Sequence, residues 1–328
     1  MHLTRETGFV HDQPDTTPAR DFIRQLDIAV AGSGRLWRAG SPAALKEAGP
    51  QPACAYVAGA SVAAFTDGIY GQQREDLLSS TLFAQLAANQ RHDRERDMLN
   101  WYAWYRTVLL KLGWRLVPAR GPKHLPARPP RRAPDVRLHR GSALRYSRDR
   151  QAPPSPALRP VLDHDGQVAD PVRVAGREFT PFRPVDIAQP RFSADGTALA
   201  LLGSKIDSAA LQTTAAALER LRSLDQRDRR TQIFESSTHQ GASGSFQIIS
   251  ANAVSEQLLS MTMAAFFYVT SEQVTRLLGF HFGRGTTTMH QACNTLTLDA
   301  TDYAPVREQV IEQLGDQAAA SIDEIELG

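Results

Sequence analysis

The chain has 328 residues with a formal net charge of +2, and 42% of its residues are apolar. This composition is typical of a globular protein that buries a sizeable core, and it excludes a chain that is acidic or basic throughout. Only Cys54 and Cys293 are present, which excludes a disulfide scaffold and a cysteine-based zinc or iron–sulfur site. We expect no cofactor and no metal, with a reducing cytoplasm as the default location.

The beginning of the chain lacks the apolar core of a secretory signal. Residues 1–25 are mixed and charged, and we predict a mobile leader there. Export through such a signal is not expected, although delivery by a route that needs no signal stays open. The longest uncharged apolar run, residues 53–65, is well short of the ~20 residues that cross a bilayer as a helix. We expect a buried element there, and no transmembrane segment.

Residues 26–117 are predicted to form the helical part of the protein. In the first long helix, Leu78, Leu82 and Leu86 recur every four residues, and Phe83 widens the apolar stripe. This pattern predicts an amphipathic helix with one apolar face and one charged face.

A second helix is predicted to open at the charged cluster of residues 93–97 and to end at Gly113. Its apolar face carries Met98, Tyr102, Tyr105, Leu109 and Leu112. Two amphipathic helices joined by so short a connection are expected to pack as an antiparallel hairpin. The aromatic residues between 101 and 105 have an alternative role, lining a ligand pocket or stacking nucleobases, but their helical spacing favours core packing.

From residue 115 to residue 159 the composition changes. This stretch carries 12 Lys and Arg residues against two Asp residues, together with nine prolines. Proline excludes long helices and central strands, and the few large apolar side chains cannot repay the entropy of ordering. We predict a long basic loop, rich in Pro and Arg, over residues 118–159, inserted between the two halves of the fold.

Residues 160–328 are predicted to form an antiparallel sheet with a C-terminal helix, in one domain with residues 26–117. The expected elements are a strand-like piece at 199–202, a helix at 208–224, strands at 246–254, 261–270, 277–282 and 286–298, a short helix at 271–278, and a last helix from Asp302 to Gly315. The predicted class is α+β, with a helical hairpin packed on the sheet and the basic insertion beside it.

Several motifs resemble those of a group of uncharacterised bacterial and fungal proteins of about this length. They are STLFAQLAAN at residues 80–89, DRE at 93–95, NWYAWYRTVLLKLGW at 100–114, and C-terminal matches around residues 296–316. The resemblance implies a shared fold, but it implies no activity, substrate or catalytic residue. The basic insertion looks like a departure from the group, so a role placed there would be particular to this protein.

Cys293 is a candidate nucleophile, with His290 three residues away and His281 nearby. A thiol needs a neighbouring base or cation before it becomes a useful nucleophile. A turn near residue 285 would make His281 and His290 cross-strand partners, whereas strand alternation would point His290 and Cys293 to opposite faces. A buried structural cysteine is the simpler interpretation.

Two functional hypotheses follow. The first is a non-catalytic binding or assembly protein, such as a delivered or toxin-associated factor. It would contact an anionic surface, an acidic protein or, with weaker support, nucleic acid. The contact would be made through Arg128, Arg131, Arg132, Arg137 and Arg140 of the insertion. The second is a cysteine-dependent acyl-transfer or hydrolytic enzyme, in which Cys293 acts with His290 or His281. The second hypothesis requires these side chains to converge.

Overall fold

A computed structural model describes residues 17–26, 28, 49–94, 97–117, 182–185, 191–240, 242–283 and 286–327. The basic loop predicted at residues 118–159 lies outside the described residues, as do the first 16 residues of the predicted leader. The end of that leader differs from the prediction. Residues Thr17–Gln25 form helix α1, and Ile23 is fully buried against the neighbouring helices. An apolar anchor therefore orders this part of the leader.

The predicted α+β class is confirmed. The main sheet follows the order β13 (Ile322–Ile325), β2 (Cys54–Ala58), β3 (Ser61–Phe65), β9 (Ser243–Ala253), β10 (Leu258–Thr270), β12 (Thr287–Asp299) and β5 (Arg115–Leu116). Two further strands pair outside this path, β6 (Arg183–Pro184) with β12 and β8 (His239–Gln240) with β9. The pairings are antiparallel except between β3 and β9, which run parallel. Residues 53–65, expected as a buried element, form the β2–β3 hairpin.

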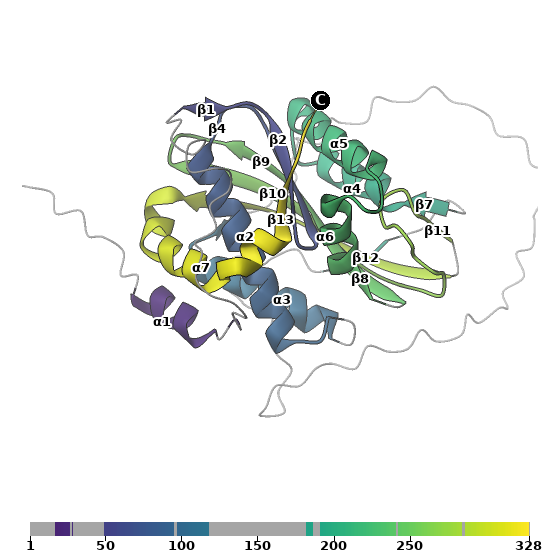
Figure 1. The fold of residues 1–328 in the computed structure, drawn as a ribbon, viewed down its shortest axis with the longest axis horizontal. Coiled ribbons are helices and arrows are strands. Elements are labelled where there is room, and N and C mark those ends of the chain that lie inside the picture. Colours follow the sequence, from purple (N-terminus) through teal and green to yellow (C-terminus); the bar gives the residue numbers. More distant parts are fainter. Residues whose placement is uncertain are drawn as a thin grey trace, which may run out of the picture. The chain divides into compact units, whose positions relative to one another are not determined.

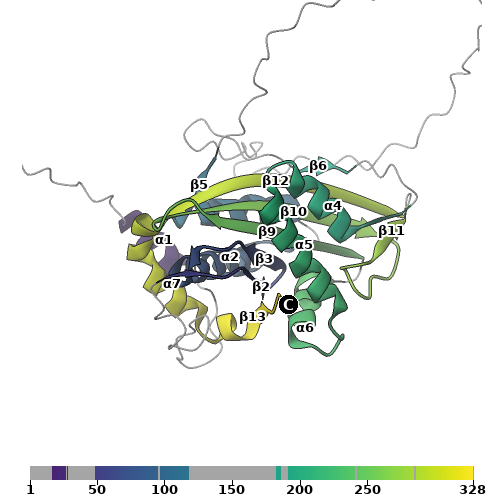
Figure 2. The ribbon, with the colours of Figure 1, turned by 90° about the horizontal axis from the view of Figure 1, so that it is seen from above.

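Helices cover both faces of this sheet. One face packs on α1, α2 (Gly71–Arg91), α3 (Met98–Lys111) and α7 (Ala300–Ser321), and the other packs on α4 (Ala194–Gly203), α5 (Ser208–Ser223) and α6 (Arg229–Thr238). The two groups of helices are separate in Figure 1 and, from above, in Figure 2. Strand β9 shows the alternation that this requires, because Ile249 packs with the first group and Ile248 with the second.

Two small pairs of strands complete the described fold. Strand β1 (Pro50–Gln51) pairs with β4 (Ile69–Tyr70), and β7 (Arg191–Ser193) pairs with β11 (His281–Gly283). No helix among the described residues is both long enough and apolar enough to cross a membrane.

Helix α2 is buried on nearly all sides, including the side that was predicted to be charged and solvated. Asp76 is 1% exposed, and its carboxylate accepts two hydrogen bonds from Arg307 of α7, at 2.6 and 2.7 Å. Ser80 accepts a hydrogen bond from the indole of Trp114 at 2.9 Å. Polar groups of α2 thus bond to α7 and to the chain after α3. The prediction of a solvated face is wrong because α7 covers it.

The aromatic residues of α3 belong to the core, as their spacing predicted. Trp101, Tyr102 and Tyr105 are at most 1% exposed. The rings of Trp101 and Tyr105 stack with centroids 5.5 Å apart, and the Trp101 indole donates to Asn89 of α2 at 2.7 Å. These residues bind α3 to α2 and to the sheet.

The second half contains the predicted helix at 208–224 and the three long strands, but α6 and the short strands β6, β7, β8 and β13 were not predicted, and other predicted elements differ. Residues 199–202 lie in helix α4, not in a strand, because Ser193 caps the helix start by accepting from the Gly196 amide. Residues 271–278 are not helical, and the strand predicted at 277–282 is reduced to β11, which pairs with β7. Strands β10 and β12 pair directly, with Thr270 opposite Thr287. Carboxylates fix the loop between them, since Glu235 accepts from the Leu277 amide and Glu272 from the Gly283 amide.

The last helix does not stop at Gly315, where its end was predicted. Helix α7 runs from Ala300 to Ser321, and Gly315 forms a kink inside it with φ 46° and ψ −132°. Glycine reaches this backbone conformation without the steric cost of a Cβ atom. The residue therefore redirects the helix toward β13.

Strands β5 and β6 are two parts of one interrupted edge strand. Leu116 lies opposite Leu296 of β12, and Arg183 lies opposite Gln291. The Val117 amide donates to Thr295 and the Val185 amide to Met289, so both segments follow the same alternation of the ladder. Strands β5 and β6, which precede and follow residues 118–181 in the sequence, therefore lie on one line along the edge of β12.

Replacing residues 118–181 with two threonines should leave a folded protein. If the pairing of β5 and the pairing of β6 with β12 are both continued, two positions opposite β12 remain between Val117 and Phe182. Two residues in extended conformation would fill them. The free energy of unfolding should stay equal or rise, because a shorter connection costs less closure entropy. Urea unfolding followed by circular dichroism would measure it.

A one-residue linker is the matched control for that deletion. A one-residue linker shifts β6 by one residue along β12, so the side chains of β6 change faces of the sheet. Phe182 would then point away from Tyr102, although in the native structure the two ring centroids are 4.4 Å apart. The one-residue variant should be clearly less stable. Loss of cooperative unfolding in the two-residue variant would contradict a single interrupted strand.

Arg307→Met should destabilise the protein by about 3 kcal/mol, because it leaves the buried Asp76 carboxylate without its cation. The double variant Asp76→Leu with Arg307→Met should recover much of this loss, since no unpaired charge remains. Chemical unfolding of the wild type, Arg307→Met, Asp76→Leu and the double variant would give the coupling free energy between the two residues.

Arg115→Met provides the control for charge loss, because Arg115 pairs with Asp302 but its side chain is 68% exposed. Its effect should stay within about 1 kcal/mol. A double variant less stable than Arg307→Met alone would show that the ion pair is not the source of the loss.

Candidate functional site

The structure does not bring the predicted Cys293 and His290 together. Both lie on β12, but Cys293 packs in the core beneath α4 and α5, whereas His290 lies on the opposite face beside Phe267. The alternation of side chains along a strand causes this separation. Burial also raises the pKa of the Cys293 thiol to about 11, which disfavours the thiolate.

His281 is equally remote from the expected arrangement. It is exposed on β11 opposite Ser193, whereas His290 lies opposite Phe267 and Pro184. The expected cross-strand pair of histidines is therefore wrong, because His281 pairs with β7 and His290 pairs with β10 and β6. The convergence on which the cysteine-enzyme hypothesis depends is not met. Within the described ranges, no group of three or more His, Cys, Asp or Glu residues is placed to hold a metal ion.

The five arginines predicted to bind an anionic surface, Arg128, Arg131, Arg132, Arg137 and Arg140, lie outside the described residues. Their attachment to the fold is described. The segment that contains them begins after β5 and ends before β6, both on the outer edge of β12.

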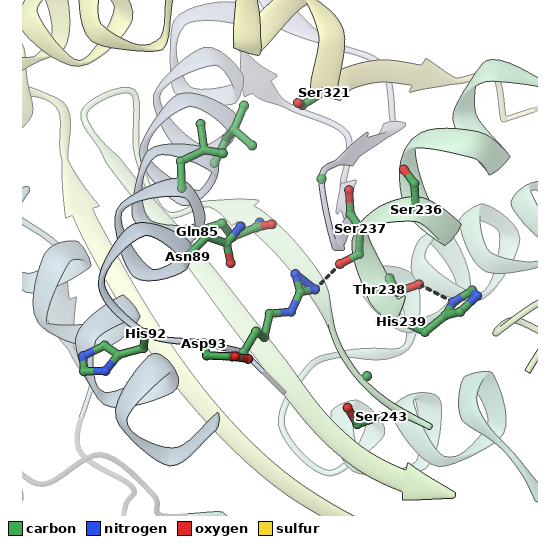
Figure 3. A pocket seen from close by; sticks show the side chains of 15 residues that line it. Gln85, Asn89, His92, Asp93, Ser236, Ser237, Thr238, His239, Ser243 and Ser321 are labelled. Atoms are coloured by element: carbon green, nitrogen blue, oxygen red, sulfur yellow. Dashed lines mark hydrogen bonds between the residues drawn. The ribbon is translucent and has the colours of Figure 1, made fainter. Parts of the chain in front are cut away.

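A cavity of about 550 Å³ lies between the end of α2, the end of α6 and the start of β9. Gln85 and Asn89 of α2 line one side, and Ser236, Ser237 and Thr238 line the other (Figure 3). This volume is within the range of small-molecule sites in proteins. Sequence patterns did not indicate it, because its described lining comes from four separate parts of the chain: Gly59, residues 82–94, residues 236–244 and Ser321.

Arg94 is the principal charged group of this cavity. One of its terminal nitrogens, Nη2, donates to the carbonyl oxygens of Ser237, near the end of α6, and of Ser245 in β9, the latter at 3.3 Å. The guanidinium carbon lies 5.4 Å from the centre of the Trp101 ring. Among the described residues, no carboxylate lies within ion-pair distance of Arg94. Burial without such a partner lowers the pKa of this guanidinium to about 10.

A hydrogen-bond network fixes the wall opposite Arg94. Gln85 accepts from the Ala60 amide at 3.0 Å and donates to Ser61 at 2.8 Å, and Ser61 donates to Gln247 of β9 at 2.9 Å. Gly59, which has φ +56°, allows this approach, because a Cβ atom there would lie 2.8 Å from the Gln85 oxygen. The wall is therefore preorganised by α2 and the β2–β3 turn.

The acid–base groups near the cavity do not form a catalytic arrangement. His239 Nδ1 lies 3.5 Å from Glu235 and 3.4 Å from the Thr238 hydroxyl. Burial lowers the pKa of His239 and raises that of Glu235, whose two oxygens accept the Leu277 amide. No serine or cysteine of the described chain hydrogen-bonds to His239. Among the described lining residues, the hydroxyl that meets His239 is that of Thr238, which is fully buried and also donates to the Glu235 carbonyl at 3.3 Å. The cavity can bind a polar group.

Arg94 was not expected at a site, because its charged neighbourhood predicts only the start of a helix. Its contacts are with Ser237 and Ser245, which are 143 and 151 residues away in the chain. No local pattern could mark it. Only the packing of α2, α6 and β9 shows its position.

Comparison with known proteins adds no relative: no family model, no curated protein and no solved structure matches this chain.

Cys293 should react slowly with iodoacetamide in the folded protein. With a pKa of about 11, only about one thiol in 3,000 is ionised at pH 7.5, against about one in ten for a free cysteine. Mass spectrometry of peptides after timed labelling would give the rate. Cys54, whose pKa burial also raises to about 11, serves as an internal control. Labelling of Cys293 at the rate of a free thiol would contradict its buried position.

Proposed function

We propose that the protein is a non-catalytic binding or assembly protein that contacts an anionic surface or an acidic protein through residues 118–159. The observation that carries the proposal is the attachment of residues 118–181, which contain this segment. Strand β5 ends before them, β6 begins after them, and both strands pair with β12. A segment inserted in this way is connected to the sheet by residues that continue one ladder. Its sequence is therefore free to serve a contact with another molecule.

The charge of the segment defines the partner. Residues 115–159 carry 12 Lys and Arg residues against two Asp residues, in a chain whose net charge is only +2. Arginine binds carboxylate and phosphate oxygens through paired donors, and clustered arginines attract polyanions with an affinity that falls as salt rises. An acidic protein or an anionic surface fits this charge, and nucleic acid is the alternative polyanion.

The arrangement of Cys293, His290 and His281 gives no comparable support to an enzyme. Cys293 is buried on one face of the sheet, His290 lies on the other, and His281 is on a separate pair of strands. We therefore favour binding over acyl transfer or hydrolysis. Three further statements are also proposals. They are action in the cytoplasm, a role as a delivered or toxin-associated factor, and membership of the group of bacterial and fungal proteins that the chain resembles.

Replacing Arg128, Arg131, Arg132, Arg137 and Arg140 with serine should abolish salt-sensitive binding to polyanions. The probes are heparin, a 20-base-pair DNA duplex and polyglutamate, each titrated at several salt concentrations. Each duplex phosphate that the variant no longer neutralises should reduce the slope of log affinity against log salt by about 0.9. The ranking of the three probes would separate a nucleic-acid partner from an acidic protein.

The control variant carries the same change in net charge elsewhere, with serine at Arg24, Lys111, Lys205, Arg220 and Arg227, all of which are exposed. It should retain most of the binding. Equal losses in both variants would indicate a general charge effect. Binding of all three probes unchanged by the five replacements in the insertion would overturn the proposed contact.

A further inference from the structure

We propose that the cavity between α2, α6 and β9 binds a small organic molecule that carries a carboxylate or phosphate group, with the Arg94 guanidinium as the partner of that group. The described residues that line this cavity do not belong to the basic insertion. The ligand proposed for the cavity is a small molecule, whereas the partner proposed for the insertion is a macromolecule or a surface. The inference goes beyond the contact proposed for residues 118–159 and does not depend on it.

The hydrogen-bonding capacity of Arg94 is only partly used. A guanidinium has five N–H donors, and the hydrogen bonds that Arg94 makes within the described chain, to Ser237 and Ser245, both come from Nη2. Nε and Nη1 have no partner among the described residues, and neither is sealed from solvent. Since Arg94 lines the cavity, these donors are available to a molecule inside it. Nε and Nη1 point in different directions, because the parallel donor pairs of a guanidinium are Nε with Nη2 and Nη1 with Nη2. Each of the two therefore offers a separate charge-assisted hydrogen bond to a carboxylate or phosphate oxygen.

The simpler role for Arg94 is to satisfy two backbone carbonyls. A cation is favourable at the C-terminal end of a helix, where Ser237 lies, and the carbonyl of Ser245 needs a donor because β3 begins only opposite Gln247. That role accounts for Nη2 but not for the other nitrogens. It also leaves a partly buried cation with no carboxylate within ion-pair distance in the described chain, and a bound anion would supply that counter-ion.

An unsatisfied polar group lies next to this corner of the cavity. The hydroxyl of Ser245 is fully buried and has no hydrogen-bond partner in the described part of the chain. By strand alternation Ser245 shares a face with Gln247 and Ile249, which is the face toward α2. Its neighbours Ser243 and Gly244 line the cavity, whereas Ser245 itself does not. A ligand is therefore inferred from the cavity and from Arg94.

The other residues that line the cavity suit a polar molecule whose anionic group is bound by Arg94. Ser236, Ser237, Thr238 and Ser243 bring hydroxyl groups to the side opposite α2, as Figure 3 shows. Asp93 also lines the cavity, and it is exposed to solvent, so its repulsion of an anion is screened. Trp101 holds the Arg94 guanidinium in place before any ligand arrives.

The test is isothermal titration calorimetry on the full chain with inorganic phosphate and, separately, with succinate. We expect saturable binding of one equivalent of at least one probe, and the stronger probe identifies the group. The titration is repeated in the variant with five serines in the insertion, where cavity binding should persist. If the variant with five serines no longer binds the probe, the probe binds to the insertion and not to the cavity. That result would overturn the cavity site, whether or not binding to polyanions is also lost.

Two cavity variants complete the test. Arg94→Lys keeps the charge but loses the guanidinium donors, and Ser236→Trp introduces a bulky ring at an exposed lining position of α6 while leaving Arg94 unchanged. Each should weaken binding at least tenfold, while Gln212→Trp, at an exposed position of α5, should not change it. Circular dichroism confirms that each variant is folded. The site is excluded if neither probe binds saturably to the wild-type chain, or if Ser236→Trp binds as the wild type does.

Discussion

The structure depends on the burial of helix α2 between the sheet and helices α3 and α7. A helix enclosed in this way must place polar side chains inside the protein, and each buried polar group is costly unless it is hydrogen-bonded. Asp76 is paired with Arg307, Ser80 with Trp114 and Gln85 with the β2–β3 turn. These contacts fix the position of α2 along its own axis, which apolar packing alone would leave free to shift.

The cavity is a consequence of where α2 ends. Gln85 joins the last turns of the helix to Ala60 and Ser61, and the chain after the helix then turns so that Arg94 contacts α6 and β9. Strand β3 starts opposite Gln247, so the beginning of β9 has no neighbour from β3. A space remains at this corner of the sheet, and a cation with unused donors faces it. The same contacts that position the helix therefore shape the candidate ligand site.

Local patterns in the sequence were sufficient for the periodic elements. The four-residue spacing of Leu78 and Leu82 predicted α2, and the alternating β-formers predicted β9, β10 and β12. They failed where distant contacts decide the outcome. Gly315 kinks α7 instead of ending it, and Arg94 acquires its role from residues more than 140 positions away. Pairing of β3 with β9, and of β5 and β6 with one strand, is equally invisible in any local window.

The parallel pairing of β3 with β9 has a consequence for the order in which the protein can fold during synthesis. The β2–β3 hairpin leaves the ribosome with both edges unpaired, because its neighbours, β9 and β13, begin only at Ser243 and Ile322. Unpaired edges of apolar strands attract other chains, and sheets that join distant segments form slowly. The nascent first half is thus the stage at which this protein is most exposed to aggregation and most dependent on chaperones.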